Sequence, residues 1–192
     1  MTSQWLWYTT RGAGVISLVL LSAVVCLGLL TRLRVRGEGW PGFLTAAVHQ
    51  DLALVALVFL GLHIVTAVVD PFTSLGIVAA TVPFGSSYHT VWLGLGTLSF
   101  ELGLAVGLTS LARRVIGARL WRAVHWLAYA CWPLAVVHAV GTGTDGHSAW
   151  LLGITIVCCG AVLTCLAWRL VAAPLDPLAQ VRSTRLMAGS DR

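Results

Sequence analysis

The stretch His49-Gln-Asp-Leu-Ala-Leu-Val-Ala-Leu-Val-Phe-Leu-Gly-Leu-His63 decides the fold, because it places two histidines 14 residues apart inside an apolar run. The surrounding segment, about Phe43–Val69, is long enough to cross a bilayer, which takes about 20 residues. A second apolar segment, about Leu120–Val140, carries His125 and His138, which are 13 residues apart. Ionisable side chains are costly inside such segments, so four histidines there indicate a functional site.

The composition is that of an integral membrane protein. Of the 192 residues, 58% are hydrophobic and 10% are charged, whereas a soluble domain carries about 25% charged residues. Five apolar spans predict an all-α bundle of five transmembrane helices, at about Gly12–Leu30, Phe43–Val69, Val91–Leu111, Leu120–Val140 and Ala149–Leu170. The net charge of +5 comes from arginines in the connections, so it indicates membrane topology and no nucleic-acid partner.

The arginines predict the orientation of the chain in the membrane. They gather in the first and third connections and in the tail, at Arg32, Arg34, Arg36, Arg113, Arg114, Arg119, Arg122, Arg169, Arg182 and Arg185. Cytoplasmic loops are enriched in such residues, so we expect the N-terminus outside and the C-terminus in the cytoplasm. The chain then divides into a short external N-terminus (1–11), a membrane domain (12–172) and a flexible cytosolic tail (173–192).

This topology makes the second and fourth spans run in the same direction. His49 then pairs with His125 near the cytoplasmic face, and His63 pairs with His138 near the outer face. Each pair could supply both axial ligands of a haem iron, which suits electron transfer better than oxygen chemistry. The two ligands on one helix would lie roughly 20 Å apart, which gives one haem for each leaflet.

Helical rotation fits one span and conflicts with the other. Fourteen residues return His63 to within about 40° of His49, whereas thirteen leave His138 about 140° from His125 on a straight helix. Pro133 lies between these two ligands, and proline distorts a helix. We therefore expect local over-winding in the fourth span.

Three arginines are candidate contacts for haem propionates. Arg119 and Arg122 precede His125 by about one turn, although their role could be topological alone. Arg11 lies on the outer side against the positive-inside bias, so a specific anionic partner there is attractive.

Other polar residues are less specific. His89 and His147 fit solvated loops, with an external acceptor or metal site as the alternative. Asp51 and Glu101 lie in costly positions and fit neutral groups, ion pairs or a proton path. The glycines Gly94, Gly96, Gly103 and Gly107 allow close helix contact. Aromatic residues fit anchors at the membrane interfaces, namely Trp5, Trp7, Tyr8, Trp40, Trp92, Trp121 and Trp150.

The His49–His63 stretch, the following Asp70-Pro71-Phe72, and Arg122-Ala-Val-His125-Trp-Leu-Ala-Tyr129 with His138 resemble the ferric reductase-like transmembrane domain family. The likeness extends from about Arg11 to Leu170 and is strongest to small stand-alone bacterial members. It implies two b-type haems held by the four matching histidines, in a multi-pass protein of the bacterial plasma membrane. It also implies an oxidoreductase component that passes electrons from a cytosolic flavin donor to an external acceptor, such as ferric iron or a periplasmic redox protein.

The chain departs from the larger family members in two ways. These members have an additional N-terminal helix and a fused domain for FAD and NAD(P)H, whereas this chain ends soon after its last span. We therefore expect FAD and NAD(P)H only on a separate cytosolic reductase, unless membrane quinol supplies the electrons.

Two alternatives remain at this point. A quinone-linked cytochrome b subunit also uses paired histidines, and reduction of the haems by quinol would distinguish it. A small non-redox transporter or assembly factor with histidines along a pore predicts purified protein without a Soret band.

Overall fold

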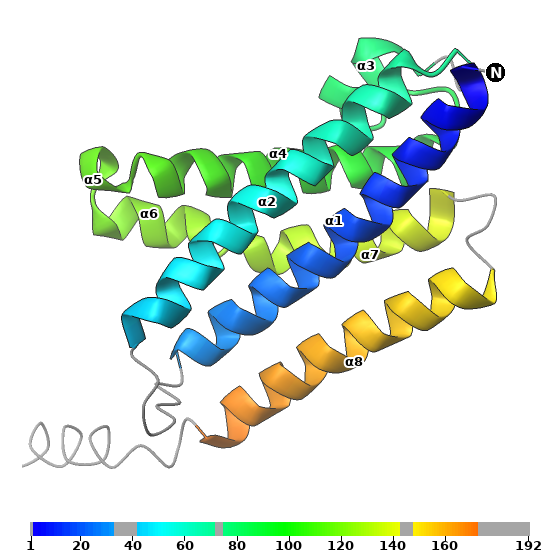
Figure 1. The fold of residues 1–192 in the computed structure, drawn as a ribbon. Coiled ribbons are helices and arrows are strands. Elements are labelled where there is room, and N and C mark those ends of the chain that lie inside the picture. Colours follow the sequence, from blue (N-terminus) through cyan, green and yellow to red (C-terminus); the bar gives the residue numbers. More distant parts are fainter. Residues whose placement is uncertain (1, 33–41, 72–74, 143–147, 173–192) are drawn as a thin grey trace, which may run out of the picture.

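The structure is a computed structural model, and it describes residues 2–32, 42–71, 75–142 and 148–172. These residues form helices and their connections, with no strand among them. In chain order the helices are α1 (Thr2–Arg32), α2 (Gly42–Val69), α3 (Gly76–Thr81), α4 (Thr90–Leu111), α5 (Arg113–Ile116), α6 (Ala118–His125), α7 (Ala128–Thr142) and α8 (Ala149–Ala172) (Figure 1).

Five helical spans are long and apolar enough to cross a membrane, as the sequence predicts. They are Gln4–Thr31, Phe43–Val69, Thr90–Leu111, Ala118–Thr142 and Ala149–Val171. The first helix begins at Thr2, so most of the expected external N-terminus (1–11) is helical. No proline interrupts residues 2–11, and the Thr9 and Thr10 hydroxyls donate back to the Trp5 and Leu6 carbonyls. The expected cytosolic tail (173–192) lies outside the described residues.

The bundle is built from two antiparallel helical hairpins and a fifth long helix. In the first hairpin α1 packs against α2, and in the second α4 packs against α6 and α7. Helix α1 also packs against α7 and α8, so it lies between α2 and α8 in the bundle (Figure 1).

Small polar side chains hold the helices together inside the bundle. Ser99 on α4 donates to the carbonyl of Cys131 on α7 (2.8 Å), and the Cys131 thiol donates to the Ser99 carbonyl (3.2 Å). The Trp132 indole on α7 donates to the Ser22 hydroxyl on α1 (2.9 Å). In lipid the outer surfaces are as apolar as the interior, so such hydrogen bonds and close packing fix the helix contacts.

The fourth span is broken into α6 and α7, and the sequence predicted only a local distortion there. Around the break, the backbone N–H groups of Leu127, Tyr129 and Ala130 donate to the carbonyls three residues earlier. Such bonds wind the chain at about 3.0 residues per turn. The predicted over-winding is therefore present, but it lies a turn before Pro133, which itself is inside α7. The proline ring crowds the carbonyl four residues earlier, at Tyr129, which places the distortion on the N-terminal side.

A compact connection covers one end of the second hairpin. The Thr97 hydroxyl of α4 donates to the Ala79 carbonyl of α3 (2.7 Å). Phe84 adopts a positive φ of 64°, and its ring packs so closely on Gly94 that a β-carbon there would overlap it. The connection between α2 and α4 is thus held against α4 by a hydrogen bond and by a glycine contact.

Candidate functional site

The four histidines within the spans come together as the two expected pairs. The imidazole centroids of His49 on α2 and His125 on α6 are 6.3 Å apart, with their planes at 64°. Those of His63 on α2 and His138 on α7 are also 6.3 Å apart, with their planes at 77°. All four side chains line one elongated cavity of about 1060 Å³. The over-winding before Pro133 explains how thirteen residues bring His125 and His138 to the same cavity.

Three of these rings are oriented by backbone carbonyls of a neighbouring helix. Nδ1 of His63 lies 2.7 Å from the Thr10 carbonyl, and Nδ1 of His49 lies 3.1 Å from the Val24 carbonyl, both on α1. Nδ1 of His138 lies 2.9 Å from the Trp92 carbonyl on α4. A carbonyl can only accept, so Nδ1 donates in each case, and Nε2 keeps the lone pair that binds a metal.

The same three rings lie against glycines one helical turn beyond those carbonyls. A β-carbon on Gly14 would lie 2.9 Å from Nδ1 of His63, and one on Gly28 would lie 3.3 Å from Cε1 of His49. A β-carbon on Gly96 would overlap the ring of His138. The glycines let each ring reach the backbone of the adjacent helix. The sequence predicted close helix contact at Gly96, and the structure shows that the contact is with a histidine ring.

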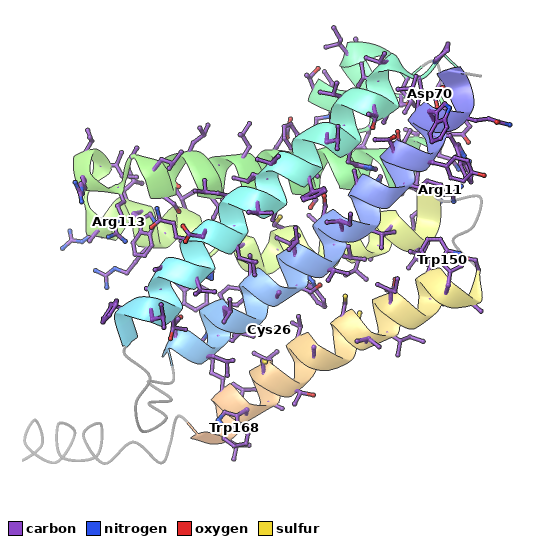
Figure 2. The ribbon with its side chains drawn as sticks, in the orientation of Figure 1. Arg11, Cys26, Asp70, Arg113, Trp150 and Trp168 are labelled. Atoms are coloured by element: carbon purple, nitrogen blue, oxygen red, sulfur yellow. The ribbon has the colours of Figure 1, made fainter. Side chains whose placement is uncertain are left out.

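The candidate arginines lie at opposite ends of the cavity. Arg11, next to Thr10, lines the cavity near the His63–His138 pair, and its guanidinium lies 4.4 Å from the Trp7 ring. Arg122 lines the other end, where its Nε donates to the Ala118 carbonyl (3.1 Å). Figure 2 shows Arg11 and Arg113 far apart, at the two ends of the bundle.

The arginines near the His49–His125 pair differ in whether they line the cavity. Arg119 is exposed and is not among the described residues that line the cavity. Arg113 and Arg114, which were considered only as topology determinants, do line it. Both residues lie on α5, which packs against α4 and α6.

A buried polar group near the His63–His138 pair was not predicted as a site residue. Asp70 is only 3% exposed and lines the cavity, and Figure 2 shows it at the same end of the bundle as Arg11. Its backbone N–H donates to the Thr66 carbonyl (3.1 Å), and the Thr66 hydroxyl lies 2.8 Å from that of Thr10. Thr10 therefore connects this polar cluster to His63 through its own carbonyl. The signal in the sequence was the acidic residue at the end of a span.

Among the described residues, three further polar candidates, Asp51, Glu101 and His89, do not line the cavity. Asp51 is exposed, and neither Asp51 nor Glu101 is among the described residues that line it. His89 is exposed at the start of α4, where its ring contacts Tyr88 with centroids 4.4 Å apart. His147 lies outside the described residues, so the expectation for it stays a prediction.

Within the part of the chain that the structure describes, no three His, Cys, Asp or Glu side chains gather to hold a metal ion. The four histidines instead form two pairs. An imidazole pair facing across a cavity can fill two opposite coordination positions, and the remaining positions would have to come from a bound group.

A comparison with known protein families shows to which family the chain belongs. The model of the family described as "ferric reductase like transmembrane component" matches residues 13–136. The chain belongs to the ferric reductase-like transmembrane family. Together with the five apolar helices, this membership makes it a multi-pass membrane protein. The matched region includes three of the four histidines and ends two residues before His138.

One curated protein of related sequence is named "Protein-methionine-sulfoxide reductase heme-binding subunit MsrQ", from Azospira oryzae. The two proteins are 30% identical over 132 residues. The alignment covers 67% of this chain and 52% of the relative, so the chain spans about half the relative's length. No solved structure matches the chain.

Proposed function

We propose that this member of the ferric reductase-like family carries electrons across the membrane through two b-type haems. His49 and His125 would hold one haem iron, and His63 and His138 would hold the other. The observation that carries the proposal is that two histidine pairs, each with centroids 6.3 Å apart, face the same cavity.

The residues fit this cofactor. An imidazole nitrogen binds a first-row metal at about 2 Å. Each ring centroid lies roughly 1 Å behind its nitrogen, so two axial imidazoles on one metal have centroids roughly 6 Å apart. Both pairs match this separation. Three of the four histidines also donate Nδ1–H to a carbonyl, which is the arrangement that orients ligating histidines and raises their basicity.

The ends of the cavity fit the carboxylate groups of a porphyrin. Arg122, Arg113 and Arg114 at one end, and Arg11 at the other, can pair with propionates through charge-assisted hydrogen bonds. Arg119 remains a weaker candidate because it is not among the described lining residues. Bound haem would supply reversible one-electron chemistry. The protein's own part is to fix the ring orientations and to exclude water from the cavity.

Direction and partners complete the proposal. The arginine distribution favours an outer N-terminus and a cytoplasmic C-terminus. Electrons would then come from a separate cytosolic flavin reductase carrying FAD and NAD(P)H, or from membrane quinol. They would leave from the His63–His138 end to an external acceptor, such as ferric iron or a periplasmic redox protein. The relative from Azospira oryzae is named as a heme-binding subunit of a reductase, which supports the redox role.

The test is a reduced-minus-oxidised absorption spectrum of detergent-purified protein, with haem quantified per chain. We expect two b-type haems, and we expect His63→Ala to remove one of them. His89→Ala is the matched control, since this exposed histidine does not line the cavity. Protein without a Soret band after expression with ample haem would overturn the proposal, as would two haems retained by His63→Ala.

A further inference from the structure

His125 faces a different neighbour from the other three histidines. In the first hairpin, Gly14 and Gly28 lie 14 residues apart on α1 and contact His63 and His49. In the second hairpin, Gly96 contacts His138, and the residue 14 positions after Gly96 is Ser110. The fourth position of the pattern therefore carries a β-carbon and a hydroxyl group.

That hydroxyl is engaged by a tryptophan next to His125. The indole Nε1–H of Trp121 donates to Oγ of Ser110 at 3.2 Å. Trp121 and His125 are four residues apart on α6, so they lie on the same helix face. Their rings have centroids 5.1 Å apart and planes tilted by 33°, which is within the range of offset ring stacking. Ser110, Trp121 and His125 all line the cavity.

The position of His125 in the chain explains why it needs such a support. It is the last residue of α6, an eight-residue helix, and the regular helical bonding changes two residues later, at Leu127. The long helix α7, which carries His138, therefore does not fix the direction of the His125 ring. The Trp121–Ser110 hydrogen bond connects α6 to α4, which is the helix that also orients His138.

We propose that Ser110 and Trp121 are positioning residues that together set the orientation of the His125 ring. This inference rests on the proposed haem function. In a ferric haem with two imidazole ligands, the angle between the ligand planes controls the electron paramagnetic resonance spectrum. Groups that orient a ligand also tune the metal's potential. Ser110 and Trp121 should thus affect the haem of the His49–His125 pair and leave the other haem unchanged.

The experiment is electron paramagnetic resonance and redox titration of purified full-length protein with haem bound. The His49→Ala variant first identifies the ferric signal that belongs to the haem of the His49–His125 pair, because that signal should be lost. Trp121→Leu should shift the largest g value and the midpoint potential of that signal only. Ser110→Ala and Trp121→Phe remove the same hydrogen bond, so each should give a smaller shift, and the double variant should shift no further than either alone.

Trp168→Leu is the matched control, because Trp168 is an exposed residue of α8 that is not among the lining residues. If Trp121→Leu loses both haems, the inference is tested with Ser110→Ala and Trp121→Phe instead. Each of them should shift the g value and midpoint potential of the His49–His125 haem only. The inference is overturned if these variants keep the spectrum of the unaltered protein, or if both haem signals shift together. Two normal signals in unaltered protein with unchanged variants refute this inference alone, whereas the absence of haem in unaltered protein refutes the proposed function.

Discussion

Replacing Gly14 by alanine should selectively weaken the haem of the His63–His138 pair. The new β-carbon would lie 2.9 Å from Nδ1 and 3.0 Å from Cε1 of His63. Ordinary contact between such atoms is roughly 3.5–4.0 Å, so the ring must recede by roughly 0.5–1 Å. Since Nδ1 now lies 2.7 Å from the Thr10 carbonyl, this movement takes the bond to or beyond the usual limit of about 3.2 Å.

The expected magnitude follows from that lost hydrogen bond. Loss of a partner that orients a ligating histidine typically costs about 10–100-fold in affinity for the metal. Gly28→Ala should cost less, because its β-carbon would meet only the edge of His49 at 3.3 Å. Gly96→Ala should cost more, because its β-carbon would overlap the His138 ring. The order of haem loss should therefore be Gly96→Ala, then Gly14→Ala, then Gly28→Ala.

Haem titration of the purified variants, followed by the Soret absorbance of each site, measures this order. Gly12→Ala is the control, since it lies on the same helix and its β-carbon would meet nothing within 4 Å. An alanine there should be neutral or stabilise α1 by about 0.5–1 kcal/mol. Equal haem affinity in Gly14→Ala and Gly12→Ala would refute the reasoning, because the histidine ring would then not depend on the missing β-carbon.

Three further predictions concern the polar cluster, the broken span and the arginines. Thr66→Val keeps the side-chain shape but removes the hydrogen bond between the Thr10 and Thr66 hydroxyls, so the free energy of unfolding should fall by about 0.6 kcal/mol in thermal unfolding. The exposed control Thr164→Val should show a smaller loss. Pro133→Ala should let the over-wound turn relax and rotate His125 away from its partner, and pyridine-haemochrome analysis should show loss of one haem, whereas a full complement would contradict this account. Arg122→Gln should lower the midpoint potential of the haem held by His49 and His125, because a nearby cation favours the reduced state. The effect should be under about 1 kcal/mol for this exposed side chain, and a raised potential would contradict the prediction.

The sequence predicted the histidine pairs because intramembrane imidazoles are rare and their spacing is informative. Hydropathy predicted all five spans. Because the second and fourth spans run in the same direction, the first histidine of one was expected to pair with the first histidine of the other. The sequence could not show what faces each ring. Gly14 and Gly28 are ordinary small residues of an apolar helix until the fold brings histidines against them.

Two other features depended on tertiary contacts. Trp121 was predicted only to be an anchor at the membrane interface, whereas in the bundle its ring contacts that of His125 and its indole N–H donates to Ser110. The fourth span was predicted as one distorted helix centred on Pro133. The distortion occurs earlier because the proline acts on the carbonyl of the preceding turn.

The arrangement of the hairpins also bears on how the protein assembles. Each histidine with a carbonyl partner is oriented from within its own hairpin, by α1 for His49 and His63 and by α4 for His138. Each pair, however, takes one imidazole from either hairpin. Closure of the bundle therefore completes each histidine pair, and bound haem would link the two hairpins in addition to the direct Trp132–Ser22 hydrogen bond. The quantity of mature protein in a membrane should consequently follow the supply of haem, because hairpins without bound haem would be more accessible to proteases.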